Sequence, residues 1–186
     1  MQCVQQGASR KPQRNLAGEI APRSNLPFFM NLSAITMNLY LELPTYLHQW
    51  LVHEFGDDQG VVHLPRGCAE HDVLELCLKK WPPREPVETM GPGKTAIAIP
   101  DLKSRPWEHY NYLNAHGKKL LIHVIHVRFR VQLWHDLSAF NKLHLPITDS
   151  IYDWMEAHGI EPEEKSWEAI RQIYFRQRKR YRKKKC

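Results

Sequence analysis

The sequence predicts an α+β fold: a small N-terminal layer of short strands and two helices, followed by a three-helix, helix-turn-helix-like C-terminal unit. Short alternating apolar runs and two runs at helical spacing intermingle along residues 37–105, whereas helical spacing dominates residues 106–186. Residues 1–36 show neither period and combine basic residues with prolines. We therefore expect a poorly ordered N-terminal extension, a small α+β domain over 37–105 and a helical domain over 106–186. Whether the extension belongs to the functional protein is left open.

Short patterned segments make up the predicted α+β domain. Alternating apolar residues predict strands over residues 39–43 and 95–99, and a short apolar run that ends at Pro65 predicts another over residues 61–64. Apolar residues at helical spacing predict helices over residues 45–55 and 73–81, each followed by Gly or Pro as a stop signal. The strands are too short for their pairing order to be predicted.

Residues 119–140 fit two patterns. Val127, Phe129, Val131 and Leu133 alternate with polar residues as in a strand, but apolar stripes at helical spacing also run through the segment. The segment contains no Gly or Pro and is longer than a usual strand. We therefore favour a helix, preceded by a loop that includes residues 110–112.

Two further helices are expected at the C-terminal end. The first covers residues 148–158 and ends at Gly159, and the second runs from near Pro162 to about residue 182. Trp167, Ile170, Ile173 and Tyr174 are predicted to form the buried stripe of the last helix.

The charges are divided unevenly along the chain. It has 26 Lys and Arg against 20 Asp and Glu, and residues 171–185 hold nine of the basic residues and none of the acidic ones. The remainder therefore carries 17 basic against 20 acidic residues, so the net charge of +6 comes from the C-terminal end. Acidic residues at the start of the last helix and basic ones at its end suit the helix dipole, but nine cations exceed what the dipole explains.

The basic end predicts a nucleic-acid-binding protein, with duplex DNA favoured over RNA, because dense cations attract polyphosphates. Interleaved Tyr174, Phe175 and Tyr181 are candidates for contact with sugar or base. One alternative is a protein-interaction adaptor with a solubilising basic tail, and another is a metal-dependent nuclease. The predicted phosphate-binding residues are Arg171, Arg176, Arg178, Lys179, Arg180, Arg182 and Lys183.

A helix, a turn at Gly159 and a basic helix follow one another, which suggests a helix-turn-helix motif. However, the sequence does not match the usual residue pattern of that motif. Aligned on this glycine, it requires a small residue and two apolar residues where the chain has Met155, Lys165 and Glu168. A looser three-helix DNA-binding unit remains. Because the early residues of the last helix are acidic, we expect phosphate contacts rather than base reading.

Three segments carry a resemblance to a known group of proteins: Tyr110-Asn111-Tyr112-Leu113, Leu133-Trp134-His135-Asp136 and Ile151-Tyr152-Asp153-Trp154-Met155. Together they resemble small uncharacterised bacterial mobile-element proteins, of conjugative transposons or prophages, over residues 37–182 at most. The resemblance implies a bacterial cytoplasmic setting with DNA nearby, and neither an activity nor catalytic residues. A role as regulator or accessory factor of a mobile element follows, with the α+β layer mediating dimerisation or partner contact.

No motif identifies a reaction or a cofactor. Gly91-Pro92-Gly93-Lys94-Thr95 resembles a phosphate-binding loop but has Glu88 at the position of the first glycine. His123 and His126 can share a helix face and, with Cys68, His71 or Asp136, form a metal site, although spacing sets no fourth ligand. The four Cys have no zinc-site spacing. We expect no catalytic residue, metal, cofactor or membrane partner, and a cytoplasmic location.

Overall fold

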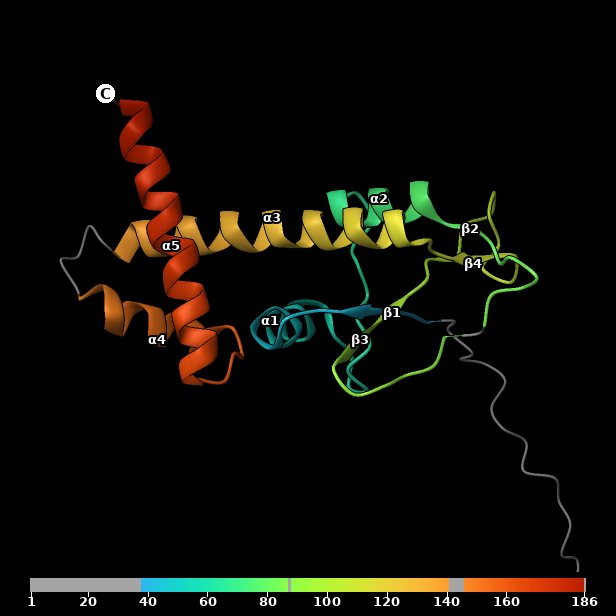
Figure 1. The fold of residues 1–186 in the computed structure, drawn as a ribbon, viewed down its shortest axis with the longest axis horizontal. Coiled ribbons are helices and arrows are strands. Elements are labelled where there is room, and N and C mark those ends of the chain that lie inside the picture. Colours follow the sequence, from blue (N-terminus) through green and yellow to red (C-terminus); the bar gives the residue numbers. More distant parts are fainter. Residues whose placement is uncertain (1–37, 87, 141–145, 186) are drawn as a thin grey trace, which may run out of the picture. The chain divides into compact units, whose positions relative to one another are not determined.

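Five helices and four short strands make up the structure, a computed structural model that describes residues 38–86, 88–140 and 146–185 (Figure 1). The predicted extension over residues 1–36 lies outside the described residues. The observed α+β architecture confirms the predicted fold class. In chain order the elements are β1 (Asn38–Glu42), α1 (Thr45–Phe55), α2 (Ala69–Cys77), β2 (Lys79–Lys80), β3 (Lys94–Ala98), β4 (Tyr110–Tyr112), α3 (Ala115–Phe140), α4 (Ile147–Ala157) and α5 (Glu164–Lys185).

Strands β1 and β3 form an antiparallel pair in which Leu39 lies opposite Ile97. This confirms two of the three predicted strands. The third prediction, over residues 61–64, is wrong, because only Val62 bridges to β3, through bonds to Ala96 and Ala98 at 2.9 Å. The next amide, of His63, donates to the carbonyl oxygen of Phe55 at 2.8 Å instead, so the segment leaves the sheet after one residue.

Helix α2 begins and ends four residues earlier than predicted. The Sγ atom of Cys68 accepts from the amide of His71 at 3.4 Å and caps the helix, and acidic residues follow in its first turn. At the other end, Lys79 and Lys80 pair with Tyr112 and Tyr110 as β2 and β4. The prediction of helix up to residue 81 and of a loop over 110–112 is therefore wrong, because this pairing joins residues about thirty positions apart in sequence.

Helix α3 confirms the helical interpretation of residues 119–140. Its buried stripe repeats every fourth residue, whereas Val131, which the alternating pattern would bury, is 60% exposed. No helix in the described part of the chain is both long enough and apolar enough to cross a membrane. The stripe consists of Leu121, Ile125, Phe129, Leu133 and Leu137.

An aromatic cluster around Phe129 joins the two predicted domains. The rings of Tyr46 and Trp50 in α1 have centroids 5.3 Å from that of Phe129, and the ring of Trp154 in α4 lies 5.5 Å away. Most of these contacts are edge-to-face, as aromatic quadrupoles favour. One hydrophobic core therefore draws on both sides of residue 105, while the domain boundary placed there stays a prediction.

Gly159 ends α4 and sets the direction in which α5 leaves it. The amides of Gly159 and Ile160 donate to the carbonyl oxygens of Glu156 and Met155 at 3.2 and 2.8 Å, which is a Schellman motif. The motif needs a left-handed residue, and Gly159 has φ of 64°. The buried side chain of Ile160 anchors the turn to the core.

Replacing Phe129 by Ala should lower the free energy of unfolding by about 3–5 kcal/mol, because a fully buried ring leaves a cavity among three aromatic neighbours. Val131→Ala, on the exposed side of the same helix, is the control and should change it by about 0.5 kcal/mol or less. Urea denaturation followed by circular dichroism measures both. Equal losses for the two variants would show that the ring cluster does not join the helices.

Gly159→Ala should destabilise the protein more than Gly60→Ala. Both glycines have positive φ, so both substitutions incur about 1–2 kcal/mol of backbone strain. A Cβ atom at residue 159 would in addition lie 2.6–3.0 Å from His53 side-chain atoms, whereas one at residue 60 meets nothing within 4 Å. Thermal unfolding of the two variants measures the difference, and equal melting temperatures would contradict this close approach.

Candidate nucleic-acid interface

Two tyrosines hold the basic helix α5 against α3. The ring of Trp134 in α3 stacks on Tyr174 and on Tyr181, with centroids 5.8 and 4.5 Å apart. Tyr174 and Ile170 are buried, which confirms part of the predicted stripe, and α5 continues past the crossing to Lys185 (Figure 1). Because these contacts set the rotation of α5 about its axis, they decide which way each cation faces.

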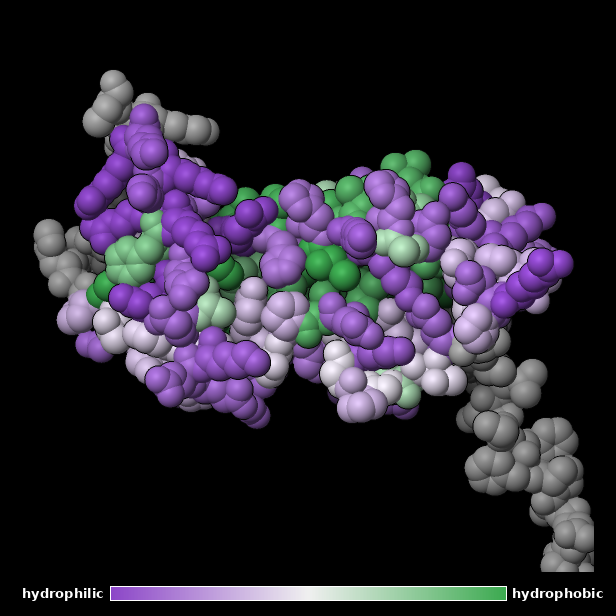
Figure 2. Space-filling model, in the orientation of Figure 1, coloured by the Kyte–Doolittle hydropathy of each residue, from purple (hydrophilic) through white to green (hydrophobic). Residues whose placement is uncertain are grey.

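One side of α5 carries a row of exposed and half-buried residues that we call the outer flank. Its residues follow the i, i+3, i+4, i+7, i+8 spacing of one helix face and line a shallow hollow. At its start the ring of Phe175 is 38% exposed, so an aromatic surface lies beside the cations. Figure 2 shows hydrophilic side chains gathered around this end of α5. The outer flank comprises Phe175, Arg178, Lys179, Arg182 and Lys183.

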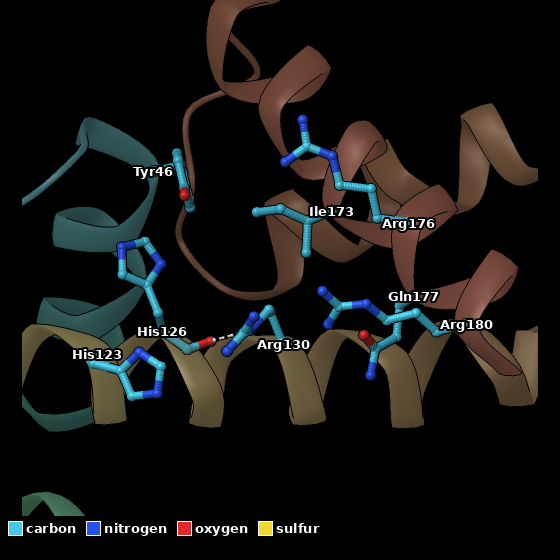
Figure 3. Close-up of a pocket in the computed structure, with 8 residues that line it drawn as sticks. All are labelled: Tyr46, His123, His126, Arg130, Ile173, Arg176, Gln177 and Arg180. Carbon is cyan, nitrogen blue, oxygen red and sulfur yellow. Dashed lines mark hydrogen bonds between the residues drawn. The ribbon is translucent and has the colours of Figure 1, made fainter.

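The other side of α5 faces a hollow that we call the inner pocket, with a volume of about 360 Å³ (Figure 3). Helices α1, α3 and α5 all contribute to its wall, and no carboxylate belongs to it. Its lining residues are Tyr46 from α1, His123, His126 and Arg130 from α3, and Ile173, Arg176, Gln177 and Arg180 from α5.

Hydrogen-bond donors dominate the inner pocket. Burial lowers the pKa of His126, and the neighbouring charges of Arg130 and His123 lower it further, which keeps its ring neutral near neutral pH. Burial also raises the pKa of Tyr46, an effect that Arg130 only partly opposes, so its hydroxyl keeps its proton. The pocket is therefore an electropositive site without an anion of its own.

Most of the predicted phosphate-binding residues have no internal counter-charge. Within the described residues, Arg178, Lys179, Arg180, Arg182 and Lys183 form no ion pair with a carboxylate. Arg176 donates to Gln172 Oε1 at 3.2 Å, which leaves its charge unpaired as well. These cations repel one another, and that repulsion remains until an external anion arrives.

Arg171 differs from the other predicted residues because it is engaged within α5. It donates to Glu168 Oε2 at 2.9 Å, and its guanidinium lies 5.5 and 5.4 Å from the ring centroids of Trp167 and Phe175. Hydrogen bonds from Gln172 and Arg171 lower the pKa of Glu168. The structure therefore groups Arg171 with the packing of α5 and not with the two cationic sides.

Burial also corrects the aromatic residues proposed for sugar or base contact. Tyr174 is 1% exposed beneath Trp134, so it is unavailable to a ligand. Tyr181 uses one ring face for stacking on Trp134 and is 47% exposed. Phe175 on the outer flank and the exposed part of Tyr181 are the aromatic surfaces that lie beside the cations.

The structure brings His123 and His126 together, but in the inner pocket and not as a metal site. No group of three or more His, Cys, Asp or Glu suited to a metal occurs in the described residues. Cys68 and His71 lie at the start of α2, where Cys68 caps the helix. Asp136 accepts from the indole Nε1 of Trp154 at 3.0 Å, which assigns it to core packing.

Sequence reasoning missed Tyr46 and Arg130 as members of the site. One signal was present, since His123, His126 and Arg130 follow an i, i+3, i+7 spacing that aligns basic groups on one helix face. For Tyr46 the sequence held no signal, because its approach to α5 depends on how the helices pack.

No protein-family model matches the chain, and no curated protein or solved structure matches it either. The resemblance to mobile-element proteins therefore stays a prediction.

Replacing His126 by Gln should flatten the pH dependence of stability. The pKa of His126 lies below its ordinary value of 6.5 in the folded protein, so the unfolded chain binds the proton first as the pH falls. This group therefore favours folding less at about pH 5 than at about pH 8. Urea denaturation across this range measures the effect. Arg130→Gln removes one cause of the shift and should give a smaller effect in the same direction. A His126→Gln profile that matches the parent would contradict the lowered pKa of His126.

Proposed function

We propose that this protein binds nucleic acid, with duplex DNA favoured over RNA, through the cationic sides of α5. The observation that carries the proposal is the row of α5 cations without internal carboxylate partners, on a helix held in place by Trp134. The proposed role as a regulator or accessory factor of a mobile element rests on the sequence resemblance alone.

Two arginines before the basic end of α5 are engaged within the protein, unlike the cations that follow them on α5. Arg128 donates to the buried carboxylate of Glu70 at 3.1 Å, and its guanidinium lies 4.7 Å from the ring centroid of Phe55. Arg171 pairs with Glu168 at the start of α5. Exposed cations elsewhere, such as Arg66 and Lys103, also lack a carboxylate partner among the described residues, but they are isolated in sequence. The cations beyond Arg171 differ because they are unpaired and crowded on one helix, which suits an external polyanion.

The placement of the cations favours a duplex. Arg180 and Arg176 lie on one side of the buried stripe of α5, and the outer flank lies on the other. An α-helix fits the major groove of B-DNA, which is about 12 Å wide and has phosphates along both walls. A helix with cations on two sides can therefore contact both phosphate rows, and such contacts position the protein without reading sequence.

Binding should depend strongly on salt. With about five phosphate contacts, the logarithm of affinity should fall with the logarithm of salt concentration at a slope of about −4.5. The variant Arg178→Gln, Lys179→Gln, Arg182→Gln, Lys183→Gln removes about four of these contacts and should reduce the slope by about 3.6. Fluorescence anisotropy with a duplex DNA and an RNA of equal length, over a salt series, measures both slopes.

The matched control neutralises four exposed cations elsewhere: Arg66→Gln, Lys79→Gln, Arg84→Gln and Lys103→Gln. It has the same net charge as the first variant and should keep nearly the parent slope. Equal losses in the two variants would reveal a general charge effect and contradict an α5 interface. A parent affinity insensitive to salt would contradict the proposal entirely.

A further inference from the structure

We propose that the inner pocket binds a single phosphate group, supplied by the phosphodiester backbone of the bound nucleic acid. This inference rests on the proposed function, and it adds residues of α1 and α3 to an interface otherwise built from α5. The phosphate would sit among Tyr46, His126, Arg130 and Arg180.

Arg130 is the residue best arranged to hold such a group. Its Nε atom donates to the carbonyl oxygen of His126 at 3.1 Å, which orients the guanidinium (Figure 3). Its two terminal NH₂ groups make no hydrogen bond or ion pair with any residue that the structure describes. A guanidinium with both terminal groups free matches the paired oxygens of a phosphate.

The remaining wall supplies further donors from different directions. Arg180 approaches from α5, and the Tyr46 hydroxyl approaches from α1, where its ring packs on Phe129 with centroids 5.3 Å apart. Charged and titratable groups facing the pocket are thus Tyr46 from α1, His123, His126 and Arg130 from α3, and Arg176 and Arg180 from α5. None of them is a carboxylate, so the wall of the pocket offers no negatively charged ligand to a metal cation.

The volume of the pocket suits one phosphate and its hydrating waters. Its volume of about 360 Å³ is many times the roughly 10–15 Å³ that a cavity needs to hold one water molecule, so it has room for a phosphate with water around it. A phosphate is held best where donors from separate elements converge without a competing anion, and three helices meet these conditions here.

Protonation of His126 links the pocket to pH. In the free protein, burial, Arg130 and His123 all disfavour the charged imidazole. A bound phosphate adds a negative charge, which opposes the effect of the Arg130 charge on the imidazole of His126. Because a phosphodiester keeps its charge throughout the accessible pH range, any gain in affinity on acidification comes from the protein.

The test measures duplex affinity of the full chain for three variants. Arg130→Gln should weaken binding about tenfold or more, because it removes charge-assisted bonds to phosphate. Arg130→Lys keeps the charge without the paired geometry and should fall between Arg130→Gln and the parent. Arg182→Gln on the outer flank removes one charge outside the pocket and is the matched control, with a smaller expected loss. Circular dichroism checks that all variants keep the parent helix content.

A second readout follows the ring signals of His126 by NMR across a pH series, with duplex and with inorganic phosphate as separate probes. Binding of duplex should raise the pKa of His126, and His126→Gln should reduce the gain in affinity at low pH. Equal losses for Arg130→Gln and Arg182→Gln, with His126 signals unmoved by duplex, would overturn the pocket while leaving an α5 interface intact.

The two sources of phosphate are distinguished by the same signals. If inorganic phosphate moves the His126 signals and the duplex fails to bind at any salt concentration, the proposed function fails and the pocket serves a small phosphorylated molecule. That outcome overturns the assignment to a phosphodiester backbone. If duplex moves the signals and inorganic phosphate displaces it only at far higher concentration, the backbone assignment holds.

Discussion

The stacking of Tyr174 and Tyr181 on Trp134 is the contact on which the candidate interface depends. These rings bring α5 across α3 and set its rotation, so the cations are divided between an outer flank and the inner pocket. A small rotation of α5 would carry Arg180 away from Arg130 and remove the pocket. Helix α3 in turn is held by the aromatic contacts of Phe129 with α1 and α4, so the interface is connected to the centre of the core.

The ion pair between Arg128 and Glu70 contrasts with the unpaired cations at the end of α5. Glu70 is buried and receives a hydrogen bond from Arg128, whose guanidinium also lies over Phe55. Beyond Arg171, the α5 cations lack carboxylate partners among the described residues, and their mutual repulsion disfavours the helix they occupy. Tertiary stacking offsets this repulsion as far as Tyr181. Holding these groups on a formed helix reduces the ordering entropy lost when a polyanion binds.

How far the site could be predicted differs between its two parts. The outer flank was predictable, because its cations are close in sequence and exceed any need for helix capping. The sequence could not distinguish Arg171 from these cations. Its spacing from Glu168 allows an ion pair, but whether the pair forms depends on the side-chain conformations in the folded protein. The inner pocket could not be predicted from the sequence. Tyr46 and Arg180 come from distant segments, and only the packing of α1, α3 and α5 brings them to one cavity.

The sequence by itself determined the features that neighbouring residues control: α1 with its bounds, the helical nature of residues 119–140, the stop at Gly159 and the charge polarity of α5. Capping, periodicity and left-handed turns all act within a few residues, so local pattern is sufficient for them. Tertiary structure decided the end of α2, the strand at residues 110–112 and the departure of residue 63 from the sheet. In each case a backbone group bonds to a partner that local pattern does not specify, and such pairing depends on how the chain folds back on itself.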